Sequence, residues 1–295
     1  MSSIQLAISL LLAVALVALA RAYAGVGDKL LDDWARARGV ELTAESRPMV
    51  AWYLRTARVL RTWGAIGGAV LPSLVELAWD GRTQVLGFGT DGSAAPYAGP
   101  MGAYIGYLVG ALYAELSLAR PVASTRRAAS IVPRELPDYL PRRLLYAQRG
   151  LALVAVLGLL AIAIVPYDTT AAEPGRLGLL AGALLVVAFA AGLERLQRWL
   201  VRRPQPFTSP SLVAADDAIR AQSVHALAGG GLALLLALCS GIFVGLAASD
   251  VAALRWTMWL PALVAFVLSV RACLDVGQRG WRVRRSLGAP ATSAT

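Results

Sequence analysis

Long apolar runs, separated by clusters of charged residues, dominate the chain. A membrane-spanning helix needs roughly 17–25 predominantly apolar residues, and seven runs reach that length. They cover residues 4–20, 63–79, 101–118, 150–166, 177–193, 224–247 and 256–272. The pattern therefore predicts an all-α integral membrane protein with about seven transmembrane helices, in one multi-pass domain over residues 1–295.

The basic residues lie between the apolar runs and predict an orientation. Nearly all of them fall in four segments: 21–62, 119–149, 194–223 and 271–285. Only Arg82, Arg176 and Arg255 remain for the loops in between. Because cytoplasmic loops retain an excess of Lys and Arg, all four basic segments are expected inside. Seven spans with the N-terminus outside and the C-terminus cytoplasmic satisfy this arrangement.

The composition agrees with a membrane protein. Hydrophobic residues make up 57% of the chain and charged residues 16%, against about 25% charged in an average soluble domain. The mean hydropathy is +0.60. The net charge of +10 is confined to the gaps between apolar runs, which favours anionic lipid headgroups as partners and excludes nucleic acid. Arginine in place of lysine, with abundant Ala, Leu and Gly, is typical of a GC-rich bacterial genome. We therefore expect a bacterial cytoplasmic membrane protein.

Three segments outside the core of the spans need separate interpretation. Ala22-Tyr23-Ala24 resembles a signal-peptide cleavage site, but residues 1–10 carry no positive charge, and an uncleaved first helix is favoured. Apolar residues in 45–62 follow helical spacing, with arginines on the opposite side. This predicts an interfacial helix on the cytoplasmic surface, with a simple extension of the second span as the alternative. Residues 288–295 are expected to form a disordered tail.

A weak internal repeat follows the third and fifth runs. Each run ends near an acidic residue, Glu115 or Glu194, and is followed by a basic loop. Each loop places an acidic residue four positions ahead of an arginine: Asp138 before Arg142, and Asp216 before Arg220. This spacing suits an ion pair on one helix face. Repeated helical hairpins would explain the pattern; transporters contain such repeats, and so do membrane proteins that transport nothing.

Few ionisable residues fall within the spans, and these are the candidate polar sites. Glu76, Glu115 and Glu194 lie within about 5 Å of a span end, where a carboxylate can reach headgroups or pair with an arginine. Ion pairing is the favoured role for all three. Glu115 is the leading functional candidate because it continues a glycine stripe. His225 is the single histidine, and a headgroup-level hydrogen bond is its favoured role.

Residue counts exclude several membrane enzymes. One histidine cannot supply the ligands of a zinc protease, and the sole lysine, Lys29, is not in the last span as a retinal-binding protein requires. Asp216 and Asp217 lack the further aspartates of a magnesium–diphosphate site. No phosphate-binding loop occurs. We therefore predict no catalytic residue, no metal site and no cofactor.

Two other sequence features concern packing and surface charge. Glycines at small-xxx-small spacing predict close helix packing, within a compact bundle or a homo-oligomer: Gly102, Gly106 and Gly110; Gly178 and Gly182; Gly241 and Gly245. The basic segments RWLVRRPQP (198–206) and PRRLL (141–145) either hold anionic headgroups or only set the topology, and the second reading is favoured.

Two classes of function remain. The first is a transport-related membrane component, either a permease or an accessory subunit with a separate ATPase. The alternative is a non-transporting scaffold or sensor whose basic cytoplasmic loops bind a protein partner or anionic lipid. The hairpin repeat favours the first class, and the scarcity of polar residues in mid-span favours the second.

Overall fold

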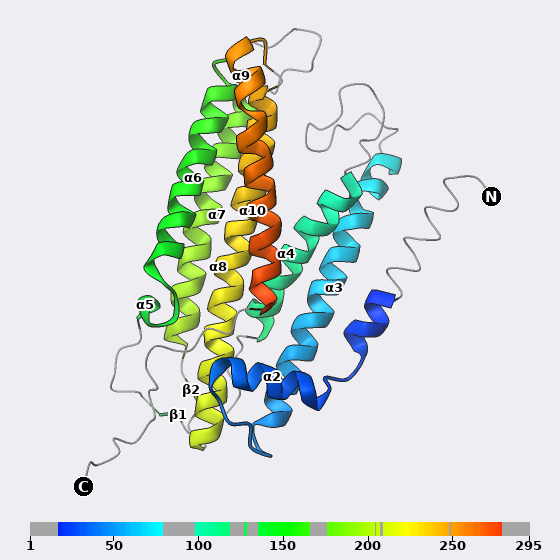
Figure 1. The fold of residues 1–295 in the computed structure, drawn as a ribbon, viewed down its shortest axis with the longest axis vertical. Coiled ribbons are helices and arrows are strands. Elements are labelled where there is room, and N and C mark those ends of the chain that lie inside the picture. Colours follow the sequence, from blue (N-terminus) through cyan, green and yellow to red (C-terminus); the bar gives the residue numbers. More distant parts are fainter. Residues whose placement is uncertain are drawn as a thin grey trace, which may run out of the picture. The chain divides into compact units, whose positions relative to one another are not determined.

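The computed structural model is almost entirely helical, which confirms the all-α class (Figure 1). It describes residues 17–78, 98–118, 127–128, 135–165, 176–203, 205–206, 209–247 and 249–278. The helices after a first one at residues 17–23 are α2 (Asp28–Arg38), α3 (Arg47–Ala78), α4 (Ala98–Leu118), α5 (Leu136–Tyr139), α6 (Arg142–Ile162), α7 (Arg176–Arg202), α8 (Pro210–Ala247), α9 (Ala252–Thr257) and α10 (Trp259–Gln278). Two-residue strands, β1 (Arg127–Ala128) and β2 (Gln205–Pro206), pair antiparallel.

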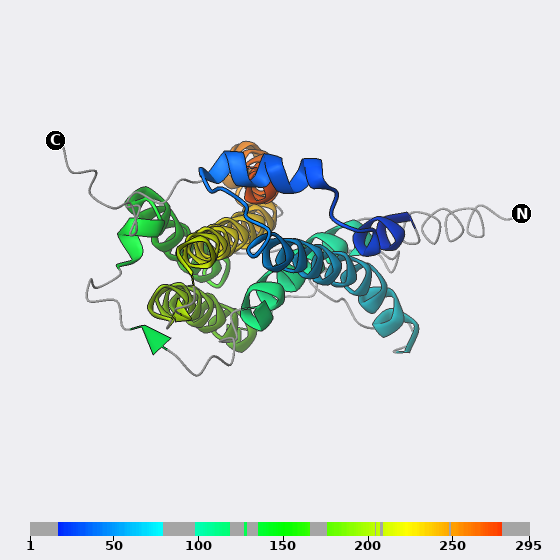
Figure 2. The same ribbon diagram turned by 90° about the horizontal axis from the view of Figure 1, so that it is seen from below.

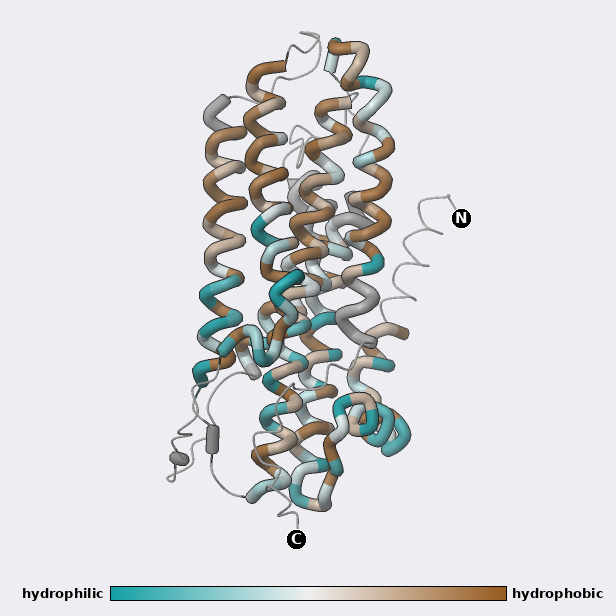
Figure 3. The backbone as a smooth tube through the Cα atoms, turned by 60° about the vertical axis from the view of Figure 1, so that its left-hand side comes forward, coloured by the Kyte–Doolittle hydropathy of each residue, from teal (hydrophilic) through white to brown (hydrophobic). Residues whose placement is uncertain are grey.

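Four helical segments among the described residues are long and apolar enough to cross a membrane. They are Arg142–Ile162, Leu179–Arg202, Pro210–Ala247 and Ala252–Ala272, and they overlap the last four predicted spans. Figure 3 shows apolar residues along most of their length, with hydrophilic residues gathered toward one end. The other three predicted spans extend beyond the residues whose side chains are described, as does the predicted tail. The number of seven spans and the orientation stay predictions.

The chain divides into two compact units, residues 1–120 and 121–295. In the first unit α3 runs unbroken from Arg47 to Ala78, so the expected interfacial segment and the described part of the second run form one helix. An unbroken helix favours the extension alternative, and the position of residues 45–62 relative to a membrane stays a prediction. Val50, Tyr53 and Ala57 are buried at helical spacing, so one face of the first part of α3 packs against the protein. Trp52, on another side of the same helix, is 59% exposed.

Helices α3 and α4 form an antiparallel hairpin whose backbones touch along glycines. A Cβ atom placed on Gly68 would lie 2.8 Å from the Cα atom of Gly106, and one on Gly106 would lie 2.7 Å from the Cα atom of Gly68. A Cβ atom on Gly64 would lie 2.8 Å from the Cα atom of Gly110. Even a methyl group has no room here. Close backbone approach supplies packing energy in lipid, where no hydrophobic force drives helices together.

The second unit is built around α8, which contacts α6, α7 and α10. Figure 2 shows these four helices nearly end-on. With 38 residues and a rise of 1.5 Å per residue, α8 is about 57 Å long, nearly twice the ~30 Å hydrocarbon thickness of a bilayer. Helix α8 is therefore longer than one membrane crossing requires. Side chains from several helices fill the core of the second unit, among them Ala155, Leu235 and Ile242.

Glycines in the second unit pack differently from those in the first. A Cβ atom on Gly182 would meet the Leu159 side chain at 3.6 Å, and one on Gly245 would meet the Ile162 side chain at 3.3 Å. A Cβ atom on either glycine would meet no described backbone atom of a neighbouring helix within 4 Å. The same small-xxx-small spacing thus produces a backbone seam between α3 and α4 and side-chain packing here.

Candidate functional site

One carboxylate joins the ends of α6 and α7. Glu194 of α7 accepts a hydrogen bond at Oε2 from Arg149 Nε of α6 at 3.2 Å, and Arg149 Nη2 donates to Oε1. Arg198, one turn further along α7, also donates to Glu194 Oε1. The Glu194 side chain is 19% exposed, whereas both arginine side chains are more than half exposed. Two guanidinium groups therefore converge on one anionic group.

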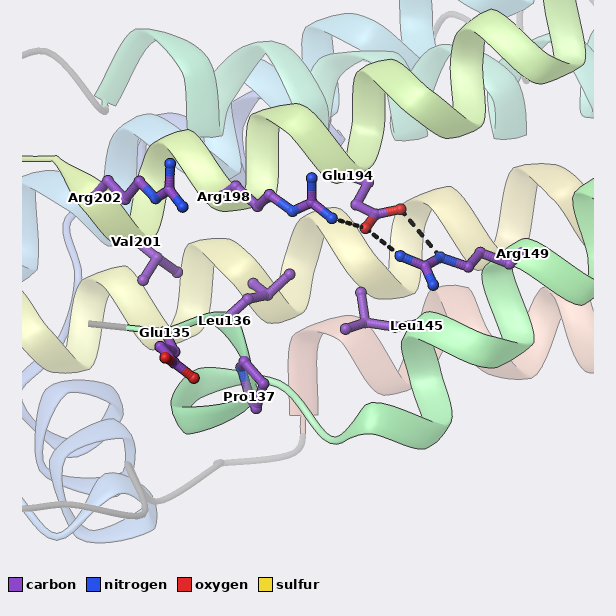
Figure 4. Close-up of a pocket in the computed structure, with 9 residues that line it drawn as sticks. All are labelled: Glu135, Leu136, Pro137, Leu145, Arg149, Glu194, Arg198, Val201 and Arg202. Atoms are coloured by element: carbon purple, nitrogen blue, oxygen red, sulfur yellow. Dashed lines mark hydrogen bonds and ion pairs between the residues drawn. The ribbon is translucent and has the colours of Figure 1, made fainter. Parts of the chain in front are cut away.

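These residues line a pocket of about 290 Å³ between α5, α6 and α7 (Figure 4). Its lining combines three arginines, two glutamates and an apolar part: Arg149, Arg198, Arg202, Glu135, Glu194, Leu136, Pro137, Leu145 and Val201. Three arginines against two glutamates leave a formal charge of +1. Leu136 and Val201 are buried. The pocket is thus basic at its edge and apolar at its base.

Arg202 differs from the other two arginines of the pocket. Its side chain forms no ion pair with any residue that the structure describes. It stands one turn beyond Arg198 on α7, on the same pocket wall. One cation of the site is therefore not neutralised within the described part of the protein.

The two basic segments singled out in the sequence meet at this pocket. Leu145 comes from PRRLL, and Arg198, Val201 and Arg202 come from RWLVRRPQP. Sequence reasoning did not bring the two segments together, and it did not connect Arg149 with Glu194. Each segment carried its own signal of clustered arginines, but their proximity depends on how α6 packs against α7.

The short helix α5 closes one side of the pocket and corrects one expectation. Asp138 accepts a hydrogen bond from the backbone N–H of Glu135 at 3.2 Å, which caps α5. Helix α5 ends at Tyr139, and Arg142 begins α6. Asp138 and Arg142 therefore do not share one helix face, and the structure gives no ion pair between these two described residues. The spacing argument for this pair required an unbroken helix.

A buried charge cluster holds the end of α7 against α8. Arg220 of α8 is 1% exposed and donates to the carbonyl oxygens of Val201 at 2.9 Å and Arg203 at 2.8 Å. Its other amino group binds Asp216 at 2.9 Å, the pair expected from the sequence. A guanidinium on the last carbonyls of a helix satisfies unpaired acceptors and complements the helix dipole. Arg220 thereby fixes the end of α7, from which Val201 lines the pocket.

Asp216 also pairs with Arg203 at 2.8 Å, an interaction not anticipated from the sequence. Burial lowers the pKa of Arg203, and the nearby positive charge of Arg220 lowers it further. Asp216 opposes both effects by lying between the two guanidinium groups. The three residues therefore act as one unit, and their burial makes this unit far less accessible than the arginines of the pocket.

Glu115 is the buried carboxylate of the first unit. Its side chain is fully buried and pairs with Arg61 of α3 at 3.2 Å. The hydroxyl group of Tyr53, also on α3, lies 3.2 Å from both carboxylate oxygens. A described partner of Glu115 thus comes from the helix that α4 packs against, a contact that the sequence pattern did not predict. This contact ties the α3–α4 hairpin at the end beyond its glycine seam.

Buried amides lie inside the second unit. Gln148 of α6 donates to the carbonyl oxygen of Ala228 at 2.9 Å, and Gln197 of α7 donates to Gln148 Oε1 at 3.4 Å. Gln197 is fully buried, and its own Oε1 atom has no hydrogen-bond partner among the described residues. A chain of polar contacts therefore links α6, α7 and α8 inside the second unit.

The structure gives fewer contacts for the remaining candidate residues. His225 is half-buried on α8, with Nδ1 3.2 Å from the carbonyl oxygen of Ala221, a contact along its own helix. The side chain of Glu76 and the surroundings of Gly178 lie outside the described residues. Within the described part of the chain, no group of three or more His, Cys, Asp or Glu residues could hold a metal ion.

Comparison with known proteins identifies no relative. No family model matches the chain, no curated protein is significantly similar to it in sequence, and no solved structure is significantly similar to its fold.

Proposed function

We propose that this chain is a scaffold or sensor in a bacterial cytoplasmic membrane, and that its arginine-lined pocket binds the phosphate of an anionic lipid headgroup. The convergence of Arg149, Arg198 and Arg202 on one pocket carries the proposal. Arginine recognises phosphate through a planar fork of N–H donors. An apolar base beneath that fork suits the glycerol and upper acyl carbons of a lipid better than it suits free phosphate.

The depth of the pocket supports a lipid over a soluble ligand. Arg149 immediately precedes the predicted span 150–166, and Glu194 immediately follows the predicted span 177–193. Both residues therefore belong at the level where the hydrocarbon ends and headgroup phosphates begin. In the predicted orientation this is the cytoplasmic leaflet, whose anionic lipids attract Lys and Arg near the surface.

The test measures lipid binding by the purified full-length chain in phosphatidylcholine nanodiscs. Short-chain phosphatidic acid is titrated and bound lipid is counted by native mass spectrometry. Arg202→Gln is expected to weaken binding about fivefold, since an arginine near an anionic surface contributes about 1 kcal/mol and 1.4 kcal/mol corresponds to tenfold. Arg255→Gln is the matched control, because Arg255 is exposed, pairs with Asp250 and lies away from the pocket. Equal binding by wild type and Arg202→Gln would overturn the proposal.

A transport-related component is the second candidate, and the amide pair Gln148–Gln197 favours it. Gln148 and Gln197 lie just beyond the cytoplasmic ends of the predicted spans 150–166 and 177–193, where buried polar groups would form the entrance of a path for substrate or ions. Gln197 keeps one buried acceptor without a partner among the described residues. Its test is proton flux into liposomes loaded with a pH-sensitive dye. If the bundle transports protons, Gln197→Leu is expected to reduce the flux. A wild-type flux no greater than that of empty liposomes would contradict the transport function.

A further inference from the structure

We propose that Glu194 is an internal competitor for the pocket: it occupies two of the arginines until the phosphate of a lipid headgroup displaces it. The inference rests on the proposed function and adds how the site is regulated. Glu194 thereby neutralises part of the positive charge of the empty pocket, and Arg149 and Arg198 become available only as the ligand enters.

The geometry of the ion pairs is the first argument. Arg149 approaches Glu194 with both Nε and Nη2, the two-pronged arrangement that arginine also uses for phosphate. Arg198 adds a second guanidinium on the same carboxylate oxygen. The carboxylate therefore occupies the two-pronged face of Arg149 that phosphate oxygens would use, and the two anions cannot bind this face at the same time.

Exposure is the second argument. The side chains of Arg149 and Arg198 are 55% and 54% exposed, and exposed ion pairs contribute little to stability. The Asp216–Arg220 pair nearby is different, since its side chains are only 11% and 1% exposed. Exchange of one anion for another is thus easy at Glu194 and difficult at Asp216.

Arg202 supplies the third argument, since it gives an incoming phosphate a first contact. It lines the same pocket and forms no ion pair within the described residues. A phosphate held by Arg202 lies in the same pocket as Arg149 and Arg198. A phosphomonoester such as that of phosphatidic acid carries up to two negative charges, so it outcompetes a single carboxylate. After exchange, the phosphate in place of Glu194 links α6 to α7.

The experiment compares two glutamates of the same pocket. The full-length chain in phosphatidylcholine nanodiscs is titrated with short-chain phosphatidic acid, and in a separate arm with inorganic phosphate. Glu194→Gln is expected to raise the affinity for phosphatidic acid about fivefold, because it frees two guanidinium groups. Glu135→Gln removes an equal charge from the lining but no arginine partner, so its gain is expected to stay below about twofold under salt screening.

A double variant separates competition from a general charge effect. If Glu194 acts by occupying Arg149, the gain from Glu194→Gln is reduced when Arg149→Gln is already present, since coupled residues give non-additive effects. Thermal unfolding without anionic lipid shows whether each variant is folded. If Glu194→Gln does not fold, Glu194→Asp replaces it; its shorter side chain retracts from Arg149, and an intermediate gain is expected.

The outcomes for the competition and for the site are distinguishable. No gain from Glu194→Gln, or a gain equal to that of Glu135→Gln, overturns the competition while a loss in Arg202→Gln still supports the lipid site. No effect of Arg202→Gln on phosphatidic acid overturns the site itself. Equal gains for inorganic phosphate and phosphatidic acid identify a soluble phosphate as the ligand and contradict the lipid assignment.

Discussion

The glycine seam between α3 and α4 allows the sharpest test of how the first unit is held together. Gly106→Ala adds one methyl group where the opposing backbone leaves no space: its Cβ atom would lie 2.7 Å from the Cα atom of Gly68 and would overlap the carbonyl oxygen of Gly64. Gly67→Ala is a matched control on α3. A Cβ atom at Gly67 meets nothing within 4 Å, although the residue is adjacent to the seam.

The expected magnitude follows from those distances. Non-bonded carbon atoms prefer separations of roughly 3.5–4.0 Å, so Gly106→Ala forces the helices apart by about 1 Å. A gap of that size forfeits roughly a quarter to a half of each dispersion contact along the seam. Overpacking of this kind costs about 1–3 kcal/mol; about 2 kcal/mol corresponds to a roughly thirtyfold change in the unfolding equilibrium. Gly67→Ala is expected to be neutral or to stabilise by about 0.5–1 kcal/mol, because alanine favours helix.

The assay is unfolding of the purified full-length chain by SDS in mixed micelles, followed by circular dichroism. The midpoint is expected to be highest for Gly67→Ala or wild type, lower for Gly106→Ala and lowest for Gly106→Val, because only the variants at Gly106 add volume at the seam. A midpoint for Gly106→Ala at or above that of Gly67→Ala would refute the close backbone packing.

Three further predictions concern charges and topology. Glu115→Gln should destabilise the chain by about 3 kcal/mol in the same titration, because it leaves Arg61, whose side chain is only 13% exposed, without this counter-charge. Tyr53→Phe should destabilise it by about 1–2 kcal/mol; a larger loss from the tyrosine variant would contradict the ion pair as the main contact. Arg220→Lys should lower the stability by about 2 kcal/mol in that titration, since lysine cannot span two carbonyl oxygens and a carboxylate. Arg202→Lys at the exposed pocket edge should leave the midpoint unchanged, and equal effects of the two variants would argue against the anchoring of α7 by Arg220. Reporter fusions should give an external signal at residue 90 and cytoplasmic signals at residues 135, 210 and 290, and a cytoplasmic signal at 90 would overturn the orientation.

Local patterns were sufficient for the class of the protein. The all-α class and the apolar character of the last four spans follow from runs of residues, because hydropathy and helix-forming tendency sum along the chain. The i,i+4 pair of Asp216 and Arg220 was equally accessible, since both residues lie on one helix whose geometry sets their separation. The same rule did not produce a pair at Asp138 and Arg142, where the helix is interrupted between them.

Contacts between helices were not accessible from local patterns. Glu115 pairs with Arg61 on α3, which is 54 residues away in the chain. The glycines at 106 and 245 have the same spacing pattern, yet one meets a backbone and the other an isoleucine side chain. In both cases the result depends on which face of a neighbouring helix lies opposite.

The sequence alone determined that apolar helices alternate with arginine-rich segments, because each of these properties resides in consecutive residues. Only the tertiary structure decided that PRRLL and RWLVRRPQP line one pocket with Arg149 and Glu194. Residues from α5, α6 and α7 meet there because α6 packs beside α7 and because Arg220 of α8 holds the last carbonyls of α7. Such proximity depends on packing between distant segments, which no single stretch of the chain specifies.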